Sequence, residues 1–115
     1  MKLTFVQVSA FAAKWKAFRF SDEDLQALEA AIMERPDAGE VMKGTGGMRK
    51  LRFAAPSART GKSGGSRVCY VVLMESGFCY LITIFAKNEK ANLTAAERNE
   101  MKQVTELIKK AHQGE

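Results

Sequence analysis

Apolar residues near the N-terminus follow first a strand pattern and then a helix pattern. Leu3 to Val8 is short and combines β-branched with aromatic residues, which predicts a strand. Phe11, Trp15 and Phe18 follow at spacings of four and three, which places them on one face of a short helix. Ser9 has a side chain suited to capping, so this helix is predicted to begin there and to end near Phe18.

A second helix is predicted to begin at Ser21, because a serine followed by three acidic residues caps a helix and favours its dipole. Its predicted end is Arg35, since Pro36 cannot continue a helix. One face carries an apolar stripe that would pack on a core, formed by Leu25, Leu28, Ala31 and Ile32.

The segment from Met48 to Ala54 alternates between two kinds of side chain, as a strand does. Leu51 and Phe53 are expected to face the core. Lys50 and Arg52 then lie together on the opposite face, because successive side chains of a strand point to opposite sides.

Two longer apolar runs predict a hairpin at the centre of a sheet. Val68 to Met74 and Phe78 to Ala86 are apolar at nearly every position, which indicates strands covered on both faces. A turn centred on Ser76 and Gly77 would pair residues whose numbers sum to about 153. Arg67 would then face the region of Ala86 and Lys87.

This register would gather charges that are scattered in sequence at one end of the sheet. Besides Arg67 and Lys87, the residues expected there are Lys50, Arg52, Arg59, Lys62, Asn88 and Glu89.

The last segment predicts a helix that packs on the sheet. Thr94 and Glu97 form a capping box, and the apolar residues that follow recur at helical spacing: Met101, Val104, Leu107, Ile108 and Ala111. Helices first, strands in the middle and a closing helix indicate an α+β fold with an antiparallel sheet. At 115 residues, the chain is expected to form one domain over residues 1–115.

The charge distribution points to a polyanionic partner. The net charge is +5, and the excess comes from the stretch between Lys43 and Met74, which holds no acid. Its basic residues are Lys43, Arg49, Lys50, Arg52, Arg59, Lys62 and Arg67. Six of the nine glycines lie in the same stretch, and a concentrated basic block with an adaptable backbone suits nucleic acid.

Several other classes of protein are disfavoured. No apolar run approaches the roughly 20 residues needed to span a bilayer, and the N-terminus turns polar too early for a signal peptide, so a cytoplasmic protein with no membrane partner is expected. Cys69 and Cys79 each lie inside an apolar run and are expected to be buried free thiols. With His112 as the only histidine, no zinc site is expected.

Three segments resemble the RelE/HigB-type toxins of bacterial type II toxin–antitoxin pairs. They are Gly44 to Phe53, Gly61 to Val68 and Tyr80 to Glu89, and the similarity is greatest to the HigB-like branch. The resemblance implies a compact α+β fold, binding in the ribosomal A site and cleavage of the messenger RNA held there, with no cofactor. It also implies a cognate antitoxin, of the helix-turn-helix DNA-binding kind, that masks the toxin and represses the shared operon as a complex on operator DNA.

The residue types fit metal-free RNA cleavage by the 2′-hydroxyl group. This reaction needs removal of the hydroxyl proton, stabilisation of the phosphorane charge and protonation of the leaving 5′-oxygen. By resemblance, Arg67 is the arginine that stabilises the phosphate charge, a role suited to its two-pronged guanidinium. Lys87 is expected to contact the phosphate or transfer a proton, with Lys62 next as acid or base and Glu89 after it.

The remaining basic residues are expected to hold the RNA backbone. Those expected to bind RNA are Arg49, Lys50, Arg52, Arg59 and Asn88. Some members of the family place a tyrosine or histidine near the C-terminal end of the site, whereas Thr94 stands where that tyrosine would fall and His112 lies far along a helix. The identity of the general base therefore stays open.

Two other functions are compatible with the charge pattern. A basic domain could occupy the ribosome or another RNA without cutting it. A DNA-binding module comes last, because the basic block lies on strands and loops rather than on a recognition helix.

Overall fold

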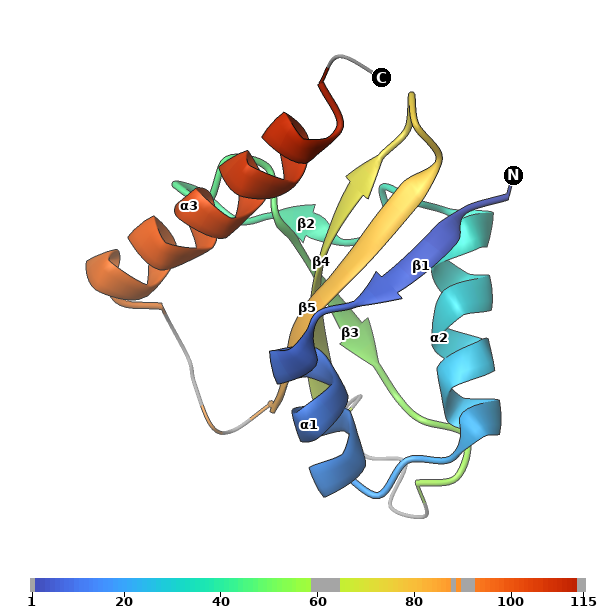
Figure 1. Ribbon diagram of the computed structural model, residues 1–115. Helices are drawn as coiled ribbons and strands as arrows, with labels where there is room; N and C mark the ends of the chain where they lie inside the picture. The colour runs from blue at the N-terminus through green and yellow to red at the C-terminus, as the bar shows by residue number, and fades with distance from the viewer. Residues whose placement is uncertain (1, 59–64, 88, 90–92, 114–115) are drawn as a thin grey trace.

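The computed structural model describes residues 2–58, 65–87, 89 and 93–113. The elements are β1 (Thr4–Gln7), α1 (Ser9–Ala17), α2 (Asp22–Glu34), β2 (Glu40–Val41), β3 (Arg49–Phe53), β4 (Ser66–Leu73), β5 (Phe78–Ala86) and α3 (Ala95–Ala111) (Figure 1). The predicted α+β class is confirmed. Within the described ranges, no helix is both long enough and apolar enough to cross a bilayer.

The five strands form one mixed sheet in the order β1-β5-β4-β3-β2. The pairs β2–β3, β3–β4 and β4–β5 are antiparallel, as expected for the centre of the sheet. The expectation of an antiparallel sheet is wrong at one edge, because β1 pairs with β5 in parallel. Such a pair needs a long connection to bring the chain back, and here two helices and three strands lie between β1 and β5.

The N-terminal helices form largely where the sequence predicts them. The predicted capping box of α2 is present, with Ser21 and Asp24 each accepting a hydrogen bond from the other's backbone N–H. The helix ends at Glu34, just before Arg35 and Pro36. For α1 the predicted cap is wrong. Ser9 is already the first helical residue, and the capping position belongs to Val8, whose side chain makes no hydrogen bond there.

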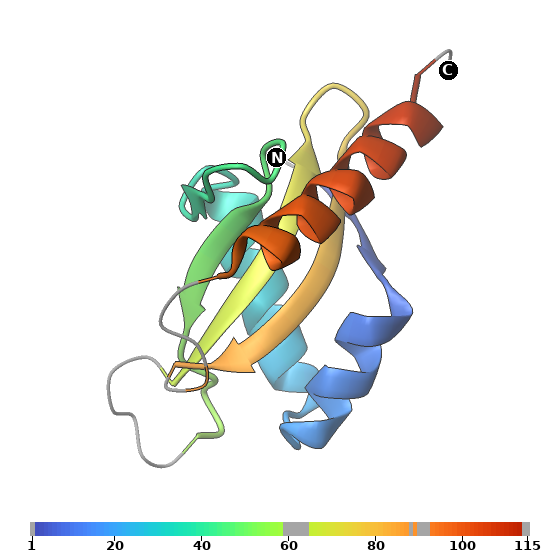
Figure 2. The same ribbon diagram turned by 90° about the vertical axis from the view of Figure 1, so that its left-hand side faces the viewer.

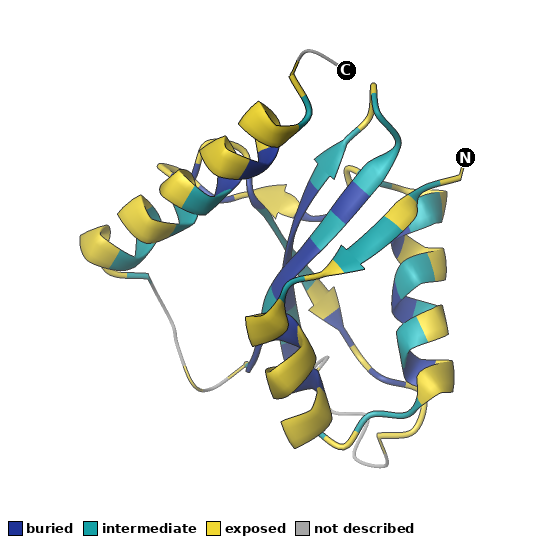
Figure 3. Ribbon diagram, in the orientation of Figure 1, coloured by how far each residue is buried: buried dark blue, intermediate teal, exposed yellow. Residues whose placement is uncertain are grey.

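Two apolar clusters lie on opposite faces of the sheet. Helices α1 and α2 cover one face and α3 crosses the other (Figures 2 and 3). The cluster beneath α1 and α2 includes Phe11, Trp15, Leu28, Ile32, Phe53, Tyr70, Leu81 and Ile84. The cluster beneath α3 includes Met42, Met48, Cys69, Val71, Ile82, Phe85 and Ile108. Strands β4 and β5 contribute to both clusters, as expected for strands covered on both sides.

The closing helix α3 begins with the predicted capping box of Thr94 and Glu97. Its predicted stripe is wrong at Leu107, which is 68% exposed, and at Ala111, which is also exposed, whereas Thr105 is buried. A heptad-like spacing alone does not fix which side of a helix faces a twisted sheet. Polar contacts also hold α3: Lys109 Nζ donates to the carbonyl oxygen of Gly46 at 2.7 Å.

Candidate nucleic-acid interface

The hairpin of β4 and β5 contains a β-bulge that sets the geometry of the site. Near the turn, cross-strand partners such as Val71 and Tyr80 have numbers that sum to 151. The register shifts between Cys69 and Tyr70, and from there to the end of the strands the sum is 152. The predicted sum of 153 is therefore wrong, and Ile82 is the extra residue in β5.

The corrected register places Arg67 opposite Phe85 rather than Ala86. The pairing continues one step beyond the strand, because the backbone N–H of Lys87 donates to the carbonyl oxygen of Gly65 at 3.0 Å. Lys87 is two residues after Phe85 and therefore lies on the same face as Arg67. Side chains in this diagonal relation have backbone positions about 7–8 Å apart. The predicted convergence of Arg67 and Lys87 at one edge is present.

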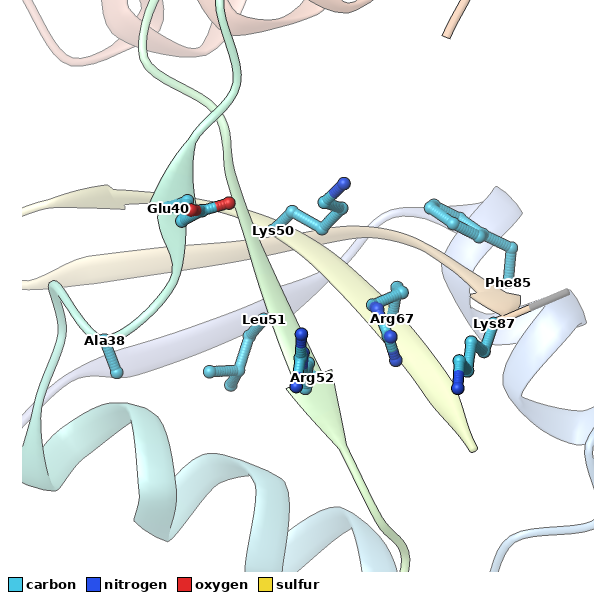
Figure 4. Close-up of a pocket in the computed structure, with 8 residues that line it drawn as sticks. All are labelled: Ala38, Glu40, Lys50, Leu51, Arg52, Arg67, Phe85 and Lys87. Carbon is cyan, nitrogen blue, oxygen red and sulfur yellow. The ribbon is translucent and has the colours of Figure 1, made fainter. Parts of the chain in front are cut away.

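Arg52 lies directly opposite Arg67 on the neighbouring strand β3. Three cations therefore form a row across the sheet, namely Arg52 on β3, Arg67 on β4 and Lys87 just after β5. Figure 4 shows these three side chains side by side, with Lys50 one pair further along β3. We call Arg52, Arg67 and Lys87 the cationic row.

The cationic row lies in a groove of about 590 Å³ on the part of the sheet that α3 leaves open. The residues that line the groove are Ala38, Glu40, Lys50, Leu51, Arg52, Arg67, Phe85 and Lys87 (Figure 4). Four of the eight are cationic and one is acidic. A concave surface of one sign concentrates the opposite charge, so the groove is suited to phosphate groups.

Most cations of this groove form no ion pair within the described part of the chain. The side chains of Lys50, Arg52 and Lys87 have neither a hydrogen bond nor an ion pair with any described residue. Arg67 is half-buried, and its Nη1 donates to the carbonyl oxygen of Ser66 at 3.1 Å, which fixes part of its guanidinium. The groove thus combines one oriented arginine with cations that are available to a ligand.

Arg49 does not belong to this groove. It lies on the opposite face of β3 from Lys50, paired with Tyr70. Its Nη1 donates to the carbonyl oxygen of Gly39 at 2.7 Å and thereby ties the turn before β2 to the sheet. The structure therefore gives Arg49 a structural contact and separates it from the other cations with which the sequence groups it.

Glu89 also lies outside the groove. Its Oε1 accepts a hydrogen bond from the backbone N–H of Ala86 at 2.7 Å, and its own N–H donates to the carbonyl oxygen of Ala86 at 3.0 Å. The carboxylate therefore closes the turn that carries Lys87. Three further sequence-predicted site residues, Arg59, Lys62 and Asn88, lie outside the described residues.

Comparison with known protein families agrees with this geometry. The family model described as the RelE toxin of the RelE/RelB toxin–antitoxin system matches residues 6–115, nearly the whole chain. The chain belongs to the RelE toxin family. It is therefore a toxin of a toxin–antitoxin system, and toxins of this family pair with an antitoxin.

In this RelE toxin, the glycine-rich segment before β3 supports α3 rather than the groove. Thr45 is buried, and its hydroxyl donates to the carbonyl oxygen of Met42 at 2.6 Å while accepting from the N–H of Met48 at 3.1 Å. Gly46 has a φ of 75°, a conformation that glycine adopts without strain, and its carbonyl oxygen receives Lys109. The Gly-Thr-Gly-Gly signature is thus a turn that docks α3.

A second support of the RelE toxin fold lies at the other end of β3. Asp24 is fully buried at the start of α2, and its Oδ1 accepts the backbone N–H of Ser57 at 3.0 Å. The Ser57 hydroxyl donates to Oδ2. Burial alone would raise the pKa of the Asp24 carboxyl, but the hydrogen bonds from Ser57 and Ser21 outweigh it and lower that pKa below its usual value. The contact fixes the segment that follows β3.

The two cysteines are free and buried, as the sequence predicts. Burial raises the pKa of both the Cys69 and the Cys79 thiols to about 12, so neither forms an appreciable amount of thiolate at neutral pH. The only histidine, His112, lies at the end of α3, where its Nε2 is 2.7 Å from the Tyr80 hydroxyl. These residues belong to the packing of the toxin and not to its groove.

Among the charged lining residues, sequence reasoning missed Glu40. It belongs to β2, which is two residues long, and pairs with Lys50. A strand this short has no alternation to read, so its register could not be predicted. The only sequence signal is an acid placed just before the apolar pair Val41 and Met42.

Proposed function

We propose that this RelE toxin is a ribosome-dependent endoribonuclease that cleaves messenger RNA in the A site without a metal ion and so stops translation. The observation that carries the proposal is the cationic row on an open face of the sheet. A phosphodiester lying along the row would meet three neighbouring cations, with no acid between them. Single-stranded RNA presents such a backbone.

In the proposed reaction, the 2′-oxygen attacks the neighbouring phosphorus and the bond to the 5′-oxygen breaks. The products are a 2′,3′-cyclic phosphate and a 5′-hydroxyl group. The transition state gathers negative charge on the non-bridging oxygens, and Arg67 is suited to bind two of them, because a guanidinium donates two parallel hydrogen bonds. Its contact with Ser66 means that part of this orientation exists before RNA binds.

Lys87 is proposed to contact the same phosphate or to give the leaving 5′-oxygen its proton. Its place on the face of Arg67 follows from the register, and its turn is closed by Glu89. We assign Glu89 to positioning Lys87, since its carboxylate oxygen accepts the N–H of Ala86 and does not line the groove. Lys62 stays a candidate for acid or base by family resemblance.

Lys50 and Arg52 are proposed to hold the RNA backbone on either side of the scissile phosphate, and Arg59 and Asn88 to assist by resemblance. None of the described groove residues beside Arg67 is a ready general base. The ribosome would therefore have to align the 2′-oxygen, the phosphorus and the leaving oxygen, and such alignment can lower the barrier by several kcal/mol. This need accounts for dependence on the ribosome.

The proposed setting is a cytoplasmic toxin–antitoxin pair of the HigB-like branch. The antitoxin would be a helix-turn-helix protein that represses the shared operon together with the toxin. Its neutralising segment is expected to bring acidic residues to the groove, because charge complementarity favours association with a cationic surface.

Primer extension on messenger RNA from expressing cells tests the proposal. Defined cuts within codons are expected with the wild-type chain. The double variant Arg67→Ala/Lys87→Ala is expected to lose at least about 100-fold in cutting, since removal of one oxyanion donor commonly has that effect. The matched control Arg35→Ala/Lys110→Ala removes the same charge from exposed positions, one just after α2 and one on α3, and should cut normally.

The alternative is a basic inhibitor that occupies the ribosome without cutting. No described groove residue beside Arg67 is a ready general base, and this favours the alternative. It predicts stalled ribosomes on intact message. Full toxicity in the Arg67→Ala/Lys87→Ala variant would show that the assigned site is wrong.

A further inference from the structure

The groove holds one carboxylate, that of Glu40, among its eight described lining residues. Glu40 is exposed on β2 and lies opposite Lys50, at the end of the groove away from Lys87. Neighbouring strands are about 4.8 Å apart, so β2 lies roughly 10 Å from the strand of Arg67. Glu40 is thus outside the cationic row but within reach of a ligand that the row holds.

An ordinary cross-strand ion pair does not account for Glu40. No described residue gives its carboxylate a hydrogen bond or an ion pair. Figure 4 shows the Lys50 ammonium group directed away from it. Its carboxylate therefore borders the groove, and no described residue uses its acceptor capacity.

A carboxylate in this place limits which part of an RNA can lie against it. An ionised carboxylate only accepts hydrogen bonds, and it repels a phosphate. RNA held by the cationic row therefore cannot run its backbone along Glu40. It must turn another part toward Glu40, and in single-stranded RNA the unstacked bases present hydrogen-bond donors on their edges.

The four bases differ in what they offer a carboxylate. Guanine presents two adjacent donors, N1–H and the N2 amino group, which match the two carboxylate oxygens. Adenine and cytosine offer one amino group beside a ring nitrogen that is itself an acceptor. Uracil offers one N–H between two carbonyl oxygens. Guanine is therefore the best partner and uracil the worst, because unmatched acceptors face each other in the other pairings.

We propose that Glu40 is a specificity-determining residue that binds the Watson–Crick edge of a guanine next to the scissile phosphate. The inference rests on the proposed nuclease function and adds to it the base that the groove selects. Glu40 takes no part in the bond-breaking step. It sets which nucleotides place their phosphate correctly on Arg67.

The test uses purified toxin and ribosome complexes programmed with transcripts that differ in one A-site nucleotide at a time. The wild-type chain should cut fastest where guanine occupies one particular position. In Glu40→Gln, an amide replaces one acceptor oxygen by a donor, and the ratio of guanine to uracil cutting rates at that position should fall about fivefold or more, as expected for losing a two-bond base contact. Glu34→Gln is the matched control on exposed α2 and should keep the wild-type ratio.

Each other outcome overturns the inference. An unchanged ratio in Glu40→Gln, or a loss of rate that is equal for all four bases, would mean that Glu40 does not select the base. In those cases the wild-type chain still cuts and the nuclease proposal stands. No cutting by the wild-type chain on any transcript would overturn both proposals together.

Discussion

Arg52 and Arg67 form a directly opposed pair of like charges in the middle of the site. Like charges in this relation destabilise a sheet, and Arg52 has no described partner that would offset the repulsion. An anion bound between the two guanidinium groups would relieve it. In the proposed function, the two residues would therefore lower the stability of the free toxin and raise its affinity for a phosphate.

Replacing Arg52 should therefore stabilise the free protein while weakening its hold on RNA. Arg52→Thr keeps strand propensity and removes one like charge, so the free energy of unfolding in urea at low salt should rise by about 0.2–1 kcal/mol. Lys50→Thr is the matched control, because the cross-strand partners of Lys50 are Glu40 and Cys69 and neither is a cation, so it should give no gain. Equal gains in stability from both variants, or a gain that persists in 1 M salt, would show that repulsion between Arg52 and Arg67 is not the cause.

Asp24 should make stability depend on pH. Its pKa is lowered in the folded state, so the ionised carboxylate stabilises the protein fully above the unfolded-state pKa, and this contribution is lost as the pH falls through the folded-state pKa. Asp24→Asn should lower the free energy of unfolding by about 1–3 kcal/mol at neutral pH. The difference from wild type should be constant above about pH 5 and should shrink below about pH 4.

Urea unfolding followed by circular dichroism at a series of pH values measures this difference. Asp22→Asn is the control, since it removes an exposed acid from the same first turn of α2 without touching Ser57. A deficit in Asp24→Asn that stays unchanged into acid would show that the carboxylate charge is not what stabilises the contact.

At the scale of elements, the end of β5 decides where Lys87 points. Glu89→Gln keeps an oxygen that can accept the N–H of Ala86, so it should cut within about twofold of wild type. Glu89→Ala loses that acceptor and should cut about 10- to 100-fold more slowly, because small displacements of a catalytic group have effects of that size. Cutting rates in the ribosome assay distinguish the two. If Gln were as damaging as Ala, Glu89 would have a chemical role through its charge.

Local signals in the sequence predict most elements of this fold but not how they meet. The capping boxes at Ser21 and Thr94 depend on neighbours three residues apart and are readable directly. The bulge at Ile82 and the parallel pairing of β1 depend on contacts between distant segments, so no local pattern reveals them. For the same reason the position of Glu40 in the groove could not be predicted, because it follows from the pairing of a two-residue strand.

Part of the candidate site could nevertheless be anticipated. Alternation along β3 predicts that Lys50 and Arg52 share a face, and the structure agrees. The same alternation leaves Arg49 on the other side, where it binds the carbonyl oxygen of Gly39. Charge alone groups Arg49 with the cations of the groove, whereas the strand period separates them.

At the scale of the whole molecule, the net charge is +5 and four cations with one acid line the groove, so binding to RNA should depend on salt. For a short single-stranded RNA, the slope of log affinity against log salt is about −0.7 for each phosphate contacted. Arg52→Ala and Lys87→Ala should each reduce the magnitude of that slope by about 0.7. Fluorescence anisotropy of a labelled oligoribonucleotide measures it.

Lys110→Ala is the control for this measurement, because Lys110 is exposed on α3, outside the groove. It should leave the slope unchanged. A uniform decrease for all three variants would mean that RNA responds to the net charge of the molecule and not to the groove.

Arg67 and Phe85 sit on interior strands that are packed from above and below. Rearranging the backbone beneath them would disrupt both apolar clusters. The protein therefore has no rearrangement of low free-energy cost that would dismantle the site. The cationic row is assembled as soon as the chain has folded. Control of the toxin must therefore come from another molecule, and RelE toxins pair with an antitoxin.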